Sequence, residues 1–130
     1  MAGATVRMNA EKQNSLQEIY TKIRSIEGAE QISKSSQAIN DVSIWTLVYE
    51  KYYLRTGSYT SATIVLTEHE QQQTACIVSS GGGSGMTNLS FGSNHKFAAE
   101  CVRTLESCGF CIIESDLDTK GKGFVERFLR

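Results

Sequence analysis

The chain has 130 residues, of which 40% are hydrophobic and 21% are charged, and its formal net charge is −1. This length predicts one domain over residues 1–130, and the composition excludes a disordered chain and a fibrous repeat. So small a net charge provides no general attraction to nucleic acid or to an anionic membrane, and we expect neither partner.

The first part of the chain is predicted to form a short strand and then one amphipathic helix. Residues 5–8 alternate in the manner of a strand, and apolar residues then recur every three or four positions over 16–26. Asn9 or Asn14 is the expected N-cap of this helix, and Gly28 is its expected C-terminal stop.

A long strand is predicted over residues 42–55, after a polar segment, 29–41, that forms an edge strand or an ordered loop. The long strand is apolar on both faces. One face holds Ile44, Val48, Tyr52 and Leu54, and the other holds Trp45, Leu47, Tyr49 and Tyr53. Because two helices cover only one face of such a sheet, we expect the second apolar face, around Trp45, Leu47 and Tyr49, to be an interface.

Alternation of apolar and polar residues predicts further strands at 59–69, 74–80, 87–91 and 111–113. A second helix is predicted to begin after Gly92, with Ser93 or Asn94 as its N-cap, and to end at Gly109. Residues 113–130 either belong to the domain or form a loosely attached tail. Together these elements predict an α+β fold, in which an antiparallel sheet of about five strands carries two helices on one face.

The glycine-rich segment before the second helix is the candidate ligand site. Glycine permits positive φ and lets backbone amides approach an anion, but the segment lacks the Lys-Ser/Thr ending of a P-loop. It is therefore either a structural turn or the cover of a small-molecule pocket. The candidate binding residues are Gly81, Gly82, Gly83, Ser84 and Gly85, with Tyr49, Glu50, Tyr52 and His95 as polar groups.

Neither the cysteines nor the histidines form a strong metal or redox motif. Cys108 and Cys111 have the C-x-x-C spacing, but the pair closes a helix, where the helix dipole disfavours a thiolate. We expect buried, inert thiols, with a redox or metal role as the alternative. His69 and His95 are too few for a two-histidine metal site without help from carboxylates, so no metal, cofactor or catalytic residue is predicted.

Three motifs stand out in the middle of the chain, namely Tyr49-Glu50-Lys51-Tyr52-Tyr53, Ser79-Ser80-Gly81-Gly82-Gly83 and Phe91-Gly92. With them, residues 42–109 resemble a family of small bacterial proteins of unknown function, found mainly in Gram-positive species, and the strand and helix before residue 42 match that family more loosely. The resemblance implies the α+β architecture and transfers no activity.

The leading functional hypothesis is a non-catalytic binding module that self-associates as a homodimer. The alternative is a small-molecule-binding protein or an enzyme with a pocket under residues 81–85. The chain shows no apolar leader and no apolar run of membrane-spanning length, and its four cysteines are interpreted as reduced thiols. We therefore expect a cytoplasmic protein.

Overall fold

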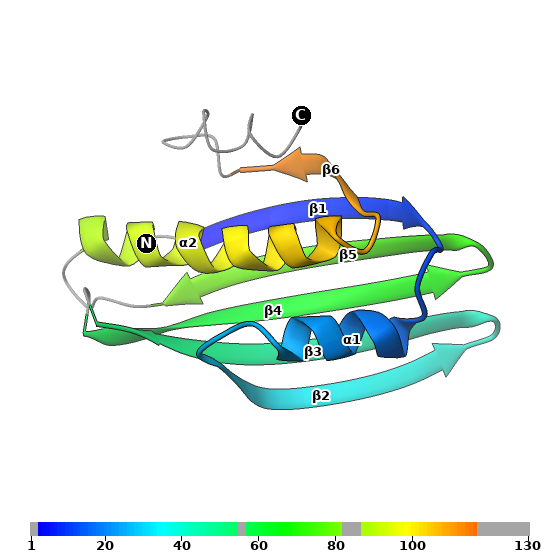
Figure 1. The fold of residues 1–130 in the computed structure, drawn as a ribbon, viewed down its shortest axis with the longest axis horizontal. Helices are drawn as coiled ribbons and strands as arrows, with labels where there is room; N and C mark the ends of the chain where they lie inside the picture. Colours follow the sequence, from blue (N-terminus) through cyan, green and yellow to red (C-terminus); the bar gives the residue numbers. More distant parts are fainter. Residues whose placement is uncertain (1–2, 55–56, 82–86, 117–130) are drawn as a thin grey trace.

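The computed structural model describes residues 3–54, 57–81 and 87–116. They form an antiparallel sheet of six strands and two helices, an α+β fold (Figure 1). In chain order the elements are β1 (Gly3–Glu11), α1 (Leu16–Arg24), β2 (Ala29–Ile39), β3 (Val42–Tyr53), β4 (Ser58–His69), β5 (Gln72–Gly81), α2 (Thr87–Glu106) and β6 (Cys111–Ser115). The strands lie in the order β2-β3-β4-β5-β1-β6, so the sheet has one strand more than the predicted five or so.

Strands β2 to β5 form a meander, and the N-terminal strand β1 enters the sheet beside β5 rather than at an edge. β1 pairs with β5 along its whole length, from Gly3 opposite Ser80 to Glu11 opposite Gln72. The strand predicted over 5–8 is therefore confirmed and is longer than expected. The polar segment after α1 is the edge strand β2, so its alternative assignment as a loop is wrong.

Both helices lie on the same side of the sheet (Figure 1), and the strands bury alternate residues toward them. In β4, for example, Ala62, Ile64 and Leu66 are buried, whereas the residues between them are half-buried. The largest fully buried apolar side chains are Val6, Met8, Ile19, Ile23, Leu47, Ile64, Leu66, Ile77, Phe97 and Leu105. Each central strand thus has one side covered by helices and one side that neither α1 nor α2 covers.

The strand predicted over residues 87–91 is wrong, because these residues form the beginning of α2. Five alternating residues are too few to distinguish a short strand from the start of a helix. Gly92 lies inside the helix rather than before it, although glycine there costs about 1 kcal/mol relative to alanine. The helix therefore begins before both of its expected N-caps. Its end agrees with the prediction, since Gly109 follows it with a φ of +95°.

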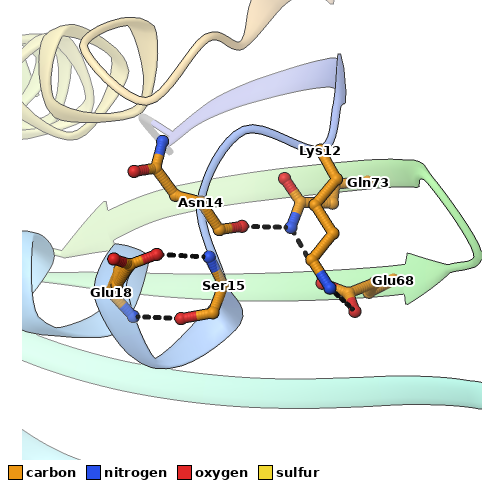
Figure 2. Close-up of polar contacts among 6 residues, drawn as sticks. All are labelled: Lys12, Asn14, Ser15, Glu18, Glu68 and Gln73. Atoms are coloured by element: carbon orange, nitrogen blue, oxygen red, sulfur yellow. Dashed lines mark hydrogen bonds and ion pairs between the residues drawn. The ribbon is translucent and has the colours of Figure 1, made fainter.

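The first helix is capped by Ser15 rather than by either of the expected asparagines. The Glu18 backbone N–H donates to Ser15 Oγ at 3.1 Å, and the Ser15 N–H donates to Glu18 Oε1 at 2.7 Å (Figure 2). This reciprocal pair is a capping box, and its S-x-x-E spacing was available in the sequence. Gly28 directly precedes β2 and has a φ of +83°, which fits its predicted role as the C-terminal stop of the helix.

A buried glutamine attaches the segment before α1 to the β4–β5 hairpin. Gln73 donates from Nε2 to the backbone oxygen of Asn14 and to Glu68 Oε1, both at 2.8 Å (Figure 2). Lys12 Nζ donates to Glu68 Oε2 at 3.0 Å. Because a buried amide is costly without partners, these bonds fix the position at which α1 begins over the sheet.

Two of the predicted segments fall only partly within the described chain. Residues 82–85 of the glycine-rich segment and residues 117–130 of the predicted tail lie outside the described residues. The first residues of that tail belong to the sheet, since β6 extends to Ser115. Within the described ranges, neither helix has the length and apolar character needed to cross a membrane.

Candidate functional site

The side of β3, β4 and β5 that faces away from the helices forms a broad surface, which we call the open face. Its residues form rows because the strands pair in register, for example Val48, Thr63 and Val78. The open face consists of Ile44, Thr46, Val48, Glu50 and Tyr52 of β3, Tyr59, Ser61, Thr63, Val65 and Thr67 of β4, and Thr74, Cys76, Val78 and Ser80 of β5. Glu50 is the only charged residue in this set.

Aromatic and β-branched side chains dominate the open face. Tyr52, Tyr59 and Val78 are 47%, 53% and 41% exposed, and the two tyrosine rings pack edge to face with their centroids 5.1 Å apart. Other apolar side chains of the face, such as Val48 and Val65, are half-buried by their neighbours. Large exposed apolar patches are uncommon on proteins outside their interaction sites.

The opposite side of β3 is covered by the helices, which corrects the predicted interface. Leu47 and Tyr49 are 0% and 2% exposed, and the ring of Trp45 packs on Tyr20 of α1 with centroids 5.9 Å apart. Leu47 and Tyr49 belong to the core and are not available to a partner in this fold, and Trp45, which is half-buried, packs against the core. Alternation identified the two apolar faces of β3 correctly, but it does not reveal which face the helices cover.

The polar groups of the candidate ligand site do not converge. Tyr49 lies on the helix-covered side of the sheet, whereas Glu50 and Tyr52 lie on the open face. His95 belongs to α2, where burial lowers its pKa and the nearby carboxylate of Asp116 opposes that shift. The three β3 residues therefore cannot line one pocket.

The glycine-rich segment begins within the described chain. Gly81 ends β5 with a φ of +98°, a conformation that disfavours any side chain. This agrees with the interpretation of the segment as a structural turn. Gly82, Gly83, Ser84 and Gly85 lie outside the described residues.

A mostly buried ion pair joins β3 to α2, and the sequence reasoning missed it. Lys51 Nζ lies 2.7 Å from Glu100 Oε1 and 2.8 Å from Glu100 Oε2, and these side chains are 14% and 21% exposed. Tyr53 donates to the same carboxylate at 3.4 Å, and its ring packs edge to face on Phe97. Both carboxylate oxygens accept bonds, so this pair is a fixed connection between elements rather than a reactive group. No local pattern could reveal a contact between residues so far apart in sequence.

Tyr49 carries a buried hydroxyl that no group among the described residues hydrogen-bonds. Burial raises its pKa from 10 to about 12, so between these pH values the folded state keeps a proton that the unfolded chain releases. Stability should therefore fall as the pH rises from 10 to 12.

Tyr49→Phe removes the unsatisfied hydroxyl, and we expect it to raise the free energy of unfolding by about 1 kcal/mol at pH 7. It should also reduce the loss of stability between pH 10 and 12. Urea unfolding at pH 7 and pH 11 measures both effects. Tyr59→Phe, at an exposed tyrosine, is the matched control and should change neither. A destabilised Tyr49→Phe variant would contradict the prediction.

The cysteines show little sign of thiol chemistry. All four are free. Cys101 and Cys108 are buried, and burial raises the pKa of Cys101 to about 12. Cys108 thus has the buried position expected of an inert thiol, whereas Cys111 is exposed, against that expectation. The C-x-x-C pair lies at the end of α2, where a thiolate is not stabilised.

Comparison with known proteins gives one match. Residues 1–109 match the model of a family described as Family of unknown function (DUF6054). No curated protein and no solved structure matches the chain. The match agrees with the predicted resemblance to a family of unknown function, and it includes β1, α1 and β2.

Proposed function

The chain belongs to the Family of unknown function (DUF6054), which brings no activity with it, and we propose that the protein is a non-catalytic binding module that forms a homodimer through the open face. The observation that carries this proposal is the near absence of charge on an extended, uncovered sheet surface. Within β3, β4 and β5, Glu50 is the only charge to be accommodated when the face is buried, and Glu30 of the edge strand β2 lies opposite it. Burying an unpaired charge costs several kcal/mol, so a surface with one charge is far better suited to burial than an ordinary protein surface.

A second copy of the chain is the occupant that fits this surface. Twisted sheets pack face to face about 10 Å apart through interdigitated side chains, and the Val, Thr, Ile and Tyr side chains of the open face suit such packing. A twofold axis would bring the same patch of both copies together, so the small number of charges on the patch keeps the repulsion between the copies low.

The surroundings of the open face support the same interpretation. On β2, Ser33 and Ser35 lie opposite Val48 and Thr46 and continue the surface with small polar side chains. On the other flank, Arg7 of β1 forms an exposed ion pair with Glu114 of β6 at 3.4 Å. An apolar centre with a polar and charged rim is the usual anatomy of a protein interface.

Val65→Lys tests the dimer, because Val65 lies in the middle of the open face opposite Thr46 and Cys76. We expect the wild-type protein to dimerise at micromolar concentration and the variant to be a monomer in analytical ultracentrifugation. Ile113→Lys introduces the same charge at an exposed residue of β6 outside the open face and is the matched control. A monomeric wild type, or a dimer that survives Val65→Lys, would refute the proposal.

The native cysteines provide a second measurement without mutation. Cys76 lies on the open face and is half-buried, whereas Cys111 is exposed on β6. Dimerisation should slow the labelling of Cys76 severalfold as the protein concentration rises and leave Cys111 unchanged. Concentration-independent labelling of Cys76 would count against a dimer on this face.

A further inference from the structure

Two hairpin turns lie side by side at one end of the sheet. Asp41 lies in the turn between β2 and β3, and Glu70 lies in the turn between β4 and β5, directly after His69. Because Val42 pairs with His69 in the β3–β4 ladder, both turns come to the same end of the sheet (Figure 1). Residues that are far apart in sequence are thus brought together by strand pairing.

Three potential metal ligands lie close together at these turns. His69 Nε2 lies 3.1 Å from Asp41 Oδ2, and one ligand atom from each of Asp41, His69 and Glu70 lies within 4.8 Å of the others. Two ligands on one tetrahedral zinc ion are ~3.4 Å apart, given bond lengths near 2.1 Å. The hydrogen-bonded His69–Asp41 pair lies close to this spacing, and all three side chains are exposed.

We propose that Asp41, His69 and Glu70 form a binding site for a divalent transition-metal ion of the Zn²⁺ class. An imidazole with two carboxylates suits such ions, whereas Ca²⁺ and Mg²⁺ prefer ligand sets made of oxygen alone. Three protein ligands leave a fourth position for water or another ligand. A bound ion would connect the β2–β3 hairpin to the β4–β5 hairpin.

The charge around the two turns supports a cation. Neither residues 35–50 nor residues 56–95 contain a lysine or an arginine. Lys12 approaches this end of the sheet through a backbone hydrogen bond to Gln71, but its ammonium group pairs with Glu68. Among the described residues, the carboxylates of Asp41 and Glu70 lie near the imidazole of His69, and an ion pair joins His69 to Asp41.

The backbone conformation at Glu70 suggests a variant that removes a ligand and keeps the turn. Glu70 has a φ of +56°, in the left-handed region that asparagine adopts more readily than glutamate. Glu70→Asn therefore removes the carboxylate while favouring the same turn. His69→Gln removes the imidazole and keeps a polar side chain of similar length.

Isothermal titration with ZnCl₂ tests the site, and the visible spectrum of Co²⁺ reports whether an imidazole and oxygen ligands surround the ion. We expect one equivalent to bind to the wild type, and affinity to fall at least tenfold in both His69→Gln and Glu70→Asn. Glu27→Gln, at an exposed carboxylate after α1, is the matched control and should bind as the wild type does.

An exposed thiol also attracts zinc, so Cys111→Ser is titrated in parallel. Unchanged affinity in Cys111→Ser places the ion away from that thiol and supports the site. Loss of binding in Cys111→Ser, unchanged binding in His69→Gln, or no saturable binding by the wild type up to millimolar zinc would each overturn the proposal.

Discussion

Leu47→Ala is expected to lower the free energy of unfolding by about 3 to 4 kcal/mol. Leu47 is fully buried between the sheet and the helices, where it lies opposite Ile64 of β4. Alanine would leave a cavity that a close-packed core fills only in part. The folded state would therefore lose both the transfer free energy of the removed carbons and their packing contacts. Urea unfolding followed by far-UV circular dichroism measures the change.

Val48→Ala, one residue along the same strand, is the comparison that separates the two sides of β3. Val48 lies on the open face and is half-buried. At protein concentrations low enough to keep the chain monomeric, we expect this variant to lose no more than about 1 kcal/mol. Equal losses for Leu47→Ala and Val48→Ala would mean that both sides of β3 are covered in the monomer, and this would contradict an open face.

Lys51→Met is expected to cost about 2 to 3 kcal/mol, the second largest effect, because it leaves the carboxylate of Glu100 mostly buried without its cation. The residual exposure of the two side chains keeps this value below that of a fully buried pair. Loss of the salt bridge should also loosen the contact between β3 and α2. Thermal and urea unfolding at pH 7 measure the loss.

The double variant Lys51→Met/Glu100→Leu tests whether the stability of the fold requires the charge pair itself or only requires that neither charge is left without its partner. Replacing both partners of a buried pair by apolar residues is often neutral, so we expect the double variant to recover most of the stability that Lys51→Met loses. The coupling between the two sites should then be 1 kcal/mol or more, about the scale seen for residues in direct contact. A double variant that loses the sum of both single changes would show that the pair contributes no coupling.

The two proposed sites lie on different parts of the same sheet. The open face is the surface of β3, β4 and β5 that α1 and α2 leave exposed, while the three proposed metal ligands lie at and beside two turns at the end of these strands. A dimer through the open face and an ion at the turns therefore make separate predictions. Failure of one experiment would leave the other unaffected.

Local pattern was enough to identify most elements of this chain. Periodicity predicts α1, β3, β4, β5 and β6, and the glycines that turn the chain after the two helices, Gly28 and Gly109, both adopt positive φ. These features depend on residues close together in sequence, since side-chain period and backbone conformation are local properties. The error at residues 87–91 has the same origin, because a window of five residues holds too little periodicity to choose between helix and strand.

What the sequence by itself determined is therefore the type of most elements, the α+β class and the presence of two apolar faces on β3. Only the tertiary structure decided that the helices cover the Leu47 side, that Lys51 meets Glu100, and that His69 lies beside Asp41. Each of these depends on how segments far apart in sequence pack and pair. Alternation assigns residues to one of two faces, but long-range packing determines which face is buried and which side chains become neighbours.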